Sequence, residues 1–260
     1  MIKLPWSGKK KVGLALSGGV ARSLAHIGIL KVFKREKIPI KMIAATSGGA
    51  MVGSLFAFGL DPDYIEEVFT RDFNLLRVSI DQINPFTNNT VQEFIEDVLG
   101  KVYFKDADIP IAVIAQDIKS GKTVVLKSGK VAPAVAASSA FPGIFNPKKI
   151  NGMSLIDGGG ADNLPVAELI RMKASITIAV DVISDRPLKK DTKNPIQVLG
   201  RALDLAIKKL TADARAAADI CIEPEIPMDI WHADYHKSKI IIEAGEKAAL
   251  KKIQEIKALL

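Results

Sequence analysis

Cysteine and histidine are scarce in this sequence, which has one cysteine and three histidines among 260 residues. A single cysteine excludes an intramolecular disulfide framework and any metal site built from several cysteines. Cys221 lies in the apolar run DICIEP, which predicts a buried side chain. We therefore expect this thiol to belong to the core.

Long hydrophobic runs are also absent, and no apolar segment reaches the ~20 residues that a membrane-spanning helix needs. The lysines at 9–11 followed by VGLALSGGVA resemble a signal peptide, but a glycine pair interrupts the apolar part and Arg22 and His26 follow it. We therefore predict no cleaved signal and a cytoplasmic protein. Because repeats, low-complexity tracts and linkers are missing, residues 1–260 are predicted to form one domain.

Acidic residues are nearly missing from the first 50 positions, which hold ten Lys/Arg and one acid. Positions 51–100 hold two Lys/Arg and nine acids, so the formal charge of +7 is unevenly placed. A basic segment suits an anionic lipid surface, nucleic acid or solubility alone. No nucleic-acid module accompanies it. We expect no nucleic-acid partner, and we keep peripheral contact with an anionic membrane as an open prediction.

The hydrophobic pattern predicts an α/β fold. An apolar run at 12–16 ends at a glycine pair and is typical of a buried strand. A helical face follows, and residues 42–45 supply a second strand, so the two strands are predicted to be parallel and joined by a right-handed crossover. Residues 61–100 are predicted to be a helical cap over or beside the sheet. Further along, the pattern predicts a strand pair at 111–116 and 123–126, helices at 131–140, 167–172 and 198–218, strands at 155–156, 176–182 and 219–222, and a terminal amphipathic helix at 239–260.

Ser47 stands where the second predicted strand meets an apolar helix, in the stretch IAATSGGAMVG. Its small neighbours Ala45, Gly48 and Gly49 allow the strained turn of a nucleophile elbow. The helix that follows supplies N-terminal amides and a positive dipole end for developing negative charge. The alternative is an ordinary turn in which Ser47 caps the helix. This stretch alone leaves both open, because ATSGG lacks the first glycine of G-x-S-x-G.

Three turns follow predicted strands: SGG at 17–19, TSGG at 46–49 and DGGG at 157–160. In an open parallel sheet the ends of neighbouring strands converge on one crevice, where ligands bind. The three turns offer complementary groups, since they supply amides for an oxyanion, a hydroxyl nucleophile and a carboxylate that can take its proton. We therefore expect them to form one site.

Four segments extend this pattern: LSGGVARSLAHIG, IAATSGGA, ASSAFPGIF and DGGGADNLPV, in this order. With them the sequence resembles the patatin-like phospholipases, especially the small bacterial type, over most of residues 12–182. The resemblance implies a three-layer α/β/α sandwich with a central, mainly parallel sheet. It also implies a Ser-Asp dyad that hydrolyses acyl esters of lipids without a metal or a cofactor.

Carried over by motif, the resemblance makes Ser47 the nucleophile and Asp157 the base. The amides of Gly18, Gly19 and Val20 would form the oxyanion hole. Arg22 follows at a basic position, where three roles are open: steadying the loop, contacting an anionic head group or forming a structural ion pair.

The sequence departs from the family pattern at several positions. Ala45 replaces a glycine two residues before the nucleophile, but it is small, so the elbow should survive. Ser17 and Val20 flank a shortened glycine run, and Ser23 stands where glycine usually follows the arginine. Val20 carries a Cβ where the backbone approaches substrate, which predicts a weakened oxyanion hole.

The glycine loop and the carboxylate of Asp157 could also have roles other than catalysis. Gly18 and Gly19 could cradle a phosphate, but GGxxRS does not match G-x-G-x-x-G and Asp61 is too distant to bind a ribose, so we expect no nucleotide. Asp157 could instead be a turn residue that bonds to its own backbone.

A catalytic triad is the alternative to a dyad, because Ser47, an aspartate and His232 have the chain order of an α/β-hydrolase. The early position of the elbow and the DGG motif argue against it. We expect His26, in the helix after the glycine loop, to be structural and His236 to be a surface residue.

We therefore expect a serine acyl hydrolase that cleaves phospholipid, lysophospholipid or acylglycerol esters through an acyl-serine. A carboxylate base works near neutral pH only if burial raises its pKa, which predicts a dry pocket. The first alternative is an acyltransferase or thioesterase that uses the same acyl-serine. The second is a weakly catalytic lipid-binding module, suggested by Ser17 and Val20 in the oxyanion loop and by the basic first segment.

Overall fold

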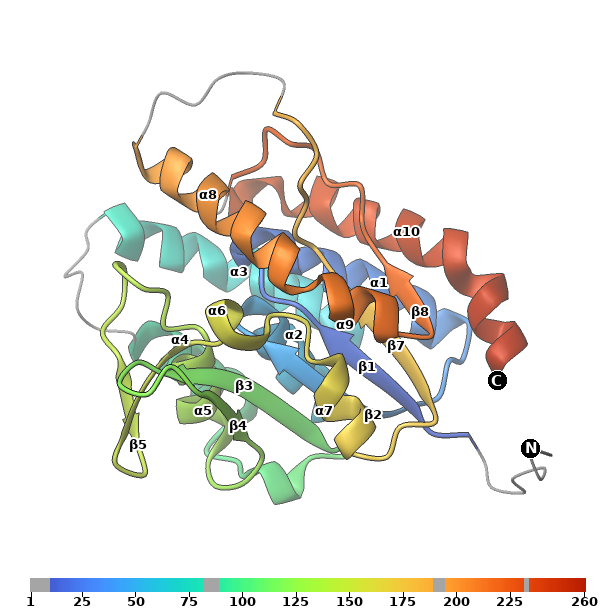
Figure 1. Cartoon of the computed structure of the whole chain (residues 1–260), viewed down its shortest axis with the longest axis horizontal. Helices are drawn as coiled ribbons and strands as arrows, with labels where there is room; N and C mark the ends of the chain where they lie inside the picture. Colours follow the sequence, from blue (N-terminus) through green and yellow to red (C-terminus); the bar gives the residue numbers. More distant parts are fainter. Residues whose placement is uncertain (1–9, 82–88, 189–194, 232–233) are drawn as a thin grey trace.

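A computed structural model describes residues 10–81, 89–188, 195–231 and 234–260. Within these residues one eight-stranded sheet has the strand order β5-β6-β3-β2-β1-β7-β8, and β4 pairs with β3 (Figure 1). The strands are β1 Val12–Leu16, β2 Ile40–Thr46, β3 Ile111–Asp117, β4 Thr123–Leu126, β5 Lys148–Ile150, β6 Met153–Asp157, β7 Ile176–Val180 and β8 Ile220–Ile222.

The centre of the sheet is parallel, as predicted. β1 pairs in parallel with β2 and β7, β2 with β3, and β7 with β8. The predicted strand pair is the antiparallel β3 and β4. The β6 and β5 strands are also antiparallel to their neighbours, so the sheet changes character beyond β3.

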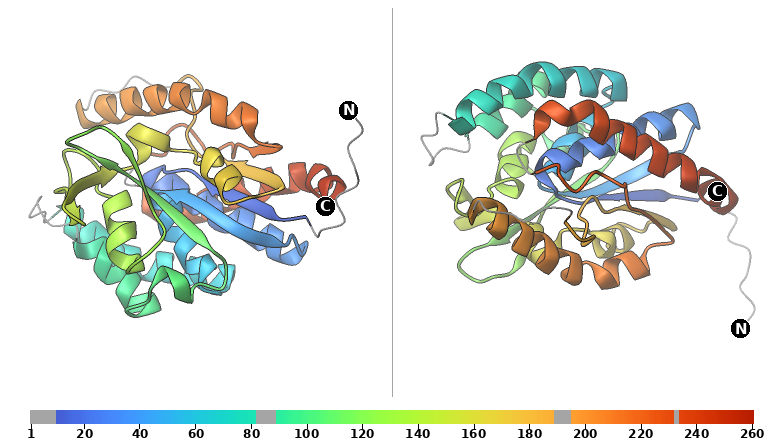
Figure 2. Two further views of the ribbon diagram at one scale, coloured as in Figure 1. Left: turned by 60° about the horizontal axis from the view of Figure 1, so that its bottom comes forward. Right: turned by 90° about the horizontal axis from the view of Figure 1, so that it is seen from above.

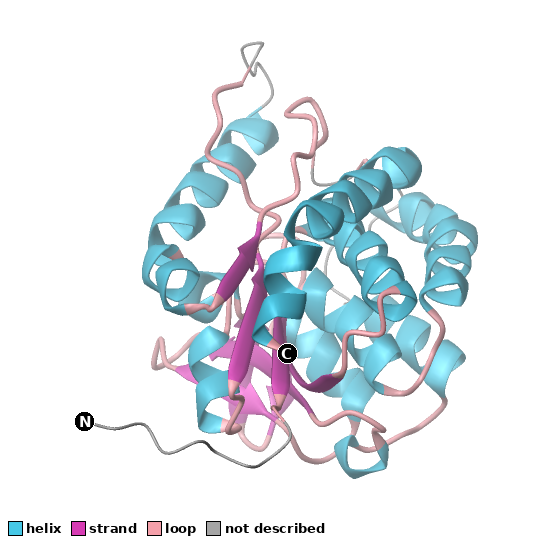
Figure 3. Ribbon diagram, turned by 90° about the vertical axis from the view of Figure 1, so that its right-hand side faces the viewer, coloured by secondary structure: helices cyan, strands magenta, loops and turns pink. Residues whose placement is uncertain are grey.

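Helices cover both faces of the sheet, which gives the expected three layers (Figure 3). One layer holds α1, α2, α3, α4, α5 and α10, and the opposite layer holds α6, α7, α8 and α9 (Figure 2). The α-helices are α1 Ala25–Arg35, α2 Gly48–Ala57, α3 Pro62–Asp81, α4 Asn89–Leu99, α5 Val131–Ser138, α6 Gly159–Asp162, α7 Val166–Arg171, α8 Pro195–Leu210, α9 Ala212–Ala217 and α10 Ser238–Leu259; short 3-10 helices are η1 Val20–Leu24, η2 Phe104–Asp106 and η3 Tyr235–Lys237.

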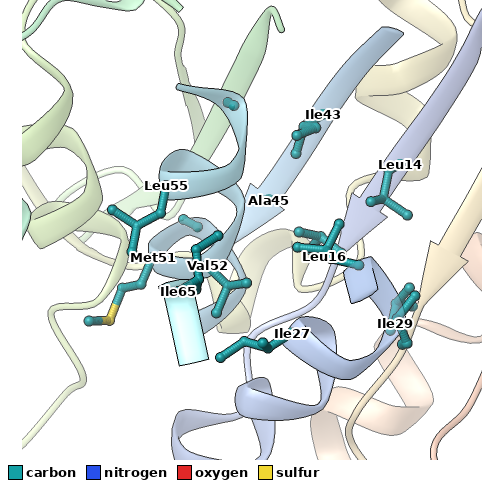
Figure 4. Close-up of a cluster of buried hydrophobic side chains, with 14 of the residues drawn as sticks. Leu14, Leu16, Ile27, Ile29, Ile43, Ala45, Met51, Val52, Leu55 and Ile65 are labelled. Atoms are coloured by element: carbon teal, nitrogen blue, oxygen red, sulfur yellow. The ribbon is translucent and has the colours of Figure 1, made fainter. Parts of the chain in front are cut away.

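The two faces of the sheet carry side chains of different size. Leu14, Leu16 and Ile43 point into the layer of α1 and α2, where they form the main core (Figure 4). Most of the alternate positions are small, and a second cluster on the opposite face contains Ala15 and Ala44 together with Met42. Because successive side chains of a strand point to opposite faces, the apolar runs in the sequence are buried on both sides.

Helices α1 and α10 cross in backbone contact. A Cβ added to Gly28 would lie 2.0 Å from the carbonyl oxygen of Ile242, and one added to Gly245 would lie 2.0 Å from that of Ala25. Neither position has room for a side chain. The C-terminal helix is therefore built into the layer that supports α1, although the sequence motifs end well before it.

The predicted helix at 198–218 is wrong in one respect, because it is two helices, α8 and α9, separated at Thr211. The carbonyl oxygen of Lys208 accepts hydrogen bonds from the Thr211 hydroxyl at 3.2 Å and from Arg215 Nη1 at 2.9 Å. Side chains thus replace the backbone donor that a continuous helix would supply.

The structure confirms some of the remaining sequence predictions and corrects others. In the described part of residues 61–100, α3 and α4 are helical, as predicted, and they pack beside α2; their role as a cap stays a prediction. Cys221 is half-buried in β8 rather than fully buried. Short elements at β5 and α6 were not predicted. Of the helices in the described ranges, none has both the length and the apolar composition required to cross a bilayer.

Candidate active site

Ser47 occupies a strained turn between β2, which ends at Thr46, and α2, which begins at Gly48. Its φ of 53° and ψ of −127° fall in a region that costs a non-glycine residue free energy. Ser47 makes no side-chain capping bond to the helix. Instead its Oγ donates a hydrogen bond to Oδ2 of Asp157 at 2.6 Å. The capping alternative is therefore not the one that the side chain adopts.

The glycines of the first two motifs let the two turns lie against each other. A Cβ on Gly18 would be 2.8 Å from the Cβ of Ser47. A Cβ on Gly49 would be 2.5 Å from the carbonyl oxygen of Ser17, and one on Gly48 would be 2.5 Å from Ser23 Oγ. The glycine loop thus packs directly on the start of α2, at a separation that larger residues would prevent.

Asp157 uses its two carboxylate oxygens for two different partners. Oδ2 accepts the hydrogen bond from Ser47, and Oδ1 accepts one from the backbone N–H of Gly159 at 2.8 Å. The turn interpretation of Asp157 and its pairing with Ser47 are therefore both realised at once. Both side chains are buried, since each residue is only 7% exposed.

Burial also changes the acidity of Asp157. Removal from water raises the pKa of its carboxyl to about 6, against the opposing hydrogen bonds from Ser47 and Gly159. Desolvation dominates because it penalises the charged form of the group. A carboxylate with this pKa is ionised at neutral pH and is a stronger base than an exposed aspartate.

The route by which Asp157 reaches the site differs from the prediction. The SGG and TSGG turns do follow the carboxyl ends of neighbouring parallel strands. However, β6 runs antiparallel to β3, and Asp157 pairs with Ala115 while Thr46 pairs with Ile114. The register of β6, which overlaps only the last part of β3, brings its final residue level with the end of β2.

The glycine loop at 17–20 is held by hydrogen bonds that the motifs alone did not reveal. The N–H of Gly18 donates to Oδ1 of Asn163 at 3.1 Å, so this amide is already engaged. The N–H groups of Gly19 and Val20 have no hydrogen-bond partner recorded within the described part of the chain. Val20 has a φ of 51°, a conformation that glycine adopts readily and a β-branched residue does not.

Arg22 lies beneath the loop in a buried ion pair. Its Nη2 is 2.8 Å from Oδ2 of Asp204 in α8, and the side chains are 9% and 4% exposed. Of the three roles open for Arg22, the structural ion pair is the one that this geometry favours. Asp204 was not singled out in the sequence, where nothing marks an aspartate 182 residues away as its partner.

Three residues that were not singled out from the sequence join the motifs through hydrogen bonds: Thr46, Ser138 and Asn163. The Ser47 N–H donates to Ser138 Oγ at 2.7 Å, and the Ser138 hydroxyl donates to the carbonyl oxygen of Ile114. Thr46 Oγ1 donates to the carbonyl oxygen of Asp162 at 2.8 Å. Ser138 and Asn163 lie within the ASSAFPGIF and DGGGADNLPV segments, so position in a motif was the available signal.

Within the described residues, neither histidine forms a hydrogen bond with Ser47 or Asp157. His26 is fully buried in α1, and its Nε2 is 2.8 Å from the Ser17 carbonyl oxygen, to which it donates. Burial lowers the pKa of His26 to about 4, so the ring is neutral at pH 7. His236 is exposed, as expected, and His232 lies outside the described residues.

Comparison with known proteins identifies a family and related sequences. The family model of the patatin-like phospholipases matches residues 14–170. An uncharacterised NTE family protein of Mycobacterium tuberculosis is 33% identical over 185 residues, which cover 70% of this chain and 51% of that protein. A lysophospholipase NTE1 of Yarrowia lipolytica is 34% identical over 179 residues, which cover 66% of this chain and 12% of that protein.

The chain therefore spans about half the length of the mycobacterial relatives that it matches, and a much smaller share of the yeast protein. Among solved structures, VipD from Legionella pneumophila has a similar fold, with a TM-score of 0.56. The sequences are 12% identical, and the superposition covers 95% of this chain and 67% of the other.

Proposed function

The chain belongs to the patatin-like phospholipase family, and from this premise we propose that it is a serine hydrolase of lipid carboxylic esters. The observation that carries the proposal is the 2.6 Å hydrogen bond from the Ser47 hydroxyl to a buried carboxylate of Asp157. A nucleophile in hydrogen-bond reach of its base is the minimum arrangement for acyl transfer to serine. The name of the Yarrowia lipolytica relative supports lysophospholipids as one substrate class.

In the first half of the proposed reaction, Ser47 Oγ attacks the acyl carbonyl carbon while Asp157 takes the hydroxyl proton. The C–O bond to the leaving alcohol then breaks, the alcohol receives the proton from Asp157, and an acyl-serine remains. In the second half, water attacks the acyl carbon and gives its proton to Asp157. The fatty acid leaves, and Ser47 recovers its proton.

We assign the stabilisation of the oxyanion to the N–H groups of Gly19 and Val20. Gly18 was the first expected donor, but its N–H is engaged by Asn163, so we give it a part in shaping the loop. The N-terminus of α2, which begins one residue after Ser47, adds a positive dipole end. These groups act only where charge develops, which is what acceleration of the chemical step requires.

Substitution at the dyad tests the proposal. Ser47→Ala and Asp157→Asn are each expected to lower kcat/KM on p-nitrophenyl butyrate by about 10³-fold or more. Ser54→Ala is the matched control, because Ser54 is a buried serine of α2, the helix that follows Ser47, and its hydroxyl donates to the Met51 carbonyl oxygen. Circular dichroism would establish that all three variants are folded. Retained activity in folded Ser47→Ala or Asp157→Asn would overturn the dyad.

Two further assays separate the alternatives. A fluorophosphonate probe should label the native protein at Ser47, and absence of labelling would favour a lipid-binding module instead. Addition of an alcohol or thiol acceptor should leave free fatty acid as the main product, whereas a transferred acyl group would favour an acyltransferase. A scan of phospholipid, lysophospholipid and monoacylglycerol would then rank the substrates.

A further inference from the structure

Helix α8 buries charge and exposes hydrocarbon, the reverse of an ordinary surface helix. Its inward stripe, at intervals of four residues, consists of Gly200, Asp204 and Lys208, all buried. Its outward stripe is apolar. The large exposed members are Val198 at 49%, Leu199 at 58%, Leu205 at 40% and Leu210 at 65%, and Ala202 and Ala206 are exposed between them.

The buried charges fix this orientation. Asp204 is paired with Arg22 at 2.8 Å, and Lys208 Nζ is 2.9 Å from Oδ2 of Asp181, which follows β7. Rotating α8 to bury its leucines would strip both ions of their partners, and breaking a buried pair is strongly destabilising. The apolar stripe is therefore held outward by the fold and cannot relax into the core.

The same helix lies directly over the candidate active site. Asp204 contacts the oxyanion loop through Arg22, and Ile207 Cδ1 would be 3.6 Å from a Cβ on Gly159, two residues after Asp157. Figure 2 (left) shows α8 at the edge of the molecule, with no other described element outside it. Its outer face is thus separated from the site by about one helix diameter, roughly 10 Å.

The charged side chains of α8 that reach solvent, Arg201 and Lys209, are both positive. Asp204 is the single acid in the sequence of α8, and it is buried, whereas Lys209 is exposed. Arg201 donates to the backbone carbonyl oxygens of residues 184–186 at 2.6 to 3.0 Å, so these contacts leave its charge unneutralised.

Of the five lysines of α10, three have acidic partners, and one of these is Lys252, which is 2.9 Å from Glu255. Lys251 is 2.8 Å from Glu225, and Lys257 is 2.6 Å from Glu36. The surface of the terminal helix is therefore mixed in charge, and most of its lysines are neutralised by acidic partners. An outward apolar stripe with unneutralised cations beside it is the combination that interfacial helices use on anionic lipid.

We propose that the outer face of α8, defined by Val198, Leu199, Leu205 and Leu210, docks the protein on an anionic phospholipid membrane. The leucines enter the boundary between head groups and acyl chains, and Arg201 and Lys209 lie near the lipid phosphates. Docking brings the candidate active site to the bilayer surface. The inference rests on the proposed function for its biological purpose, but membrane binding itself is measured independently of hydrolysis.

The experiment uses the whole chain carrying Ser47→Ala, so that vesicles stay intact. Co-flotation is measured with vesicles of phosphatidylcholine alone and of phosphatidylcholine with one-fifth phosphatidylglycerol. The test variant adds L199Q, L205Q and L210Q. The matched control adds I240Q and L250Q, which change two α10 residues that are 50% and 45% exposed. Since all these side chains already face solvent, the fold should survive in both.

The parent and the control are expected to float with the anionic vesicles and at least about tenfold less with phosphatidylcholine alone. The α8 variant should lose about tenfold or more of the partition coefficient on anionic vesicles. In the background with Ser47 intact, its hydrolysis of dissolved p-nitrophenyl butyrate should be unchanged while its hydrolysis of vesicle phospholipid falls.

Three outcomes would overturn the proposal. The first is equal vesicle binding by parent and α8 variant, and the second is equal loss in the α10 control. The third is a dimer in sedimentation velocity that the α8 variant converts to a monomer, because a second copy would then cover this face. Failure of the proposed function is distinguishable, since it would appear as no hydrolysis of the dissolved ester while vesicle binding persists.

Discussion

Oδ1 of Asn163 accepts a hydrogen bond from the N–H of Gly18 at 3.1 Å, and its Nδ2 donates to the Gly18 carbonyl oxygen at 3.5 Å. Asn163 follows α6, the short helix that starts two residues after Asp157. One side chain therefore ties the glycine loop to the turn that carries the proposed base. We therefore expect this contact to fix the position of the proposed oxyanion donors relative to Asp157.

Asn163→Ala is expected to act on kcat more than on KM. Without the side chain the Gly18 peptide can rotate, and the neighbouring donors lose their fixed direction toward the oxyanion. Removal of a single donor costs about 10²- to 10³-fold in kcat elsewhere, so we expect about 10-fold or more for a positioning residue. Steady-state kinetics on p-nitrophenyl butyrate and the rate of fluorophosphonate labelling measure it. An unchanged kcat in the folded variant would refute this role.

Asp157 should define the acid limb of the pH profile. The reaction needs its ionised form, and the pKa of the free enzyme is about 6. We expect kcat/KM to level off above this pH and to fall tenfold per pH unit well below it. A profile between pH 4 and 9 on an uncharged ester tests this. An acid limb near pH 4 would mean that a carboxyl exposed to water is the base.

The same raised pKa predicts a stability cost at neutral pH. Because the folded pKa lies above the usual value of about 4, the favourable contribution is present at low pH and is lost as the pH rises through about 6. The ionised, buried carboxylate then costs about 3 kcal/mol. Asp157→Asn should therefore be more stable than the native protein at pH 8, with the gain vanishing near pH 4. Urea denaturation at both values measures it, and a gain independent of pH would contradict it.

At position 20 we expect glycine to give a more stable protein than alanine, the reverse of the usual order. Ordinarily glycine is less stable than alanine in a structured segment by about 0.5–1 kcal/mol. At a φ of 51° the left-handed conformation costs an L-residue about 1–2 kcal/mol. Val20→Gly is therefore expected to be more stable than Val20→Ala, by about 1 kcal/mol. The pair removes nearly the same side chain, so an alanine variant that is equally or more stable would argue against strain at this position.

Gly28→Ala should separate α1 from α10. The added methyl would meet the Ile242 carbonyl oxygen at 2.0 Å, and backbone cannot move aside as a side chain can. We expect a loss of about 3 kcal/mol or more in the free energy of unfolding. Gly53→Ala is the comparison, because its methyl would meet only side chains, at 3.1 Å or beyond. Similar stability losses in the two variants would show that the helix crossing is not the cause.

Much of the fold follows from patterns within short stretches of sequence. Apolar runs that end in glycine turns located β1 and β2, and two apolar runs on either side of a short turn with a glycine located the β3–β4 pair, because burial and turn chemistry are local properties. Ser47 and Asp157 were found in the same way, since the motifs that contain them also shape the turns that hold them. The proposed nucleophile and base can therefore be identified from local sequence motifs alone.

The partners of these turns were decided only by tertiary structure. The antiparallel course of β6, the Asn163 contact to Gly18 and the pairing of Arg22 with Asp204 each join residues far apart in the chain. No local pattern specifies them, because they depend on register and on which helix covers the loop. For the same reason the sequence alone predicted a long helix at 198–218 but not which of its faces is buried. Its buried ion pairs decide that the charged stripe faces inward and the leucines face out.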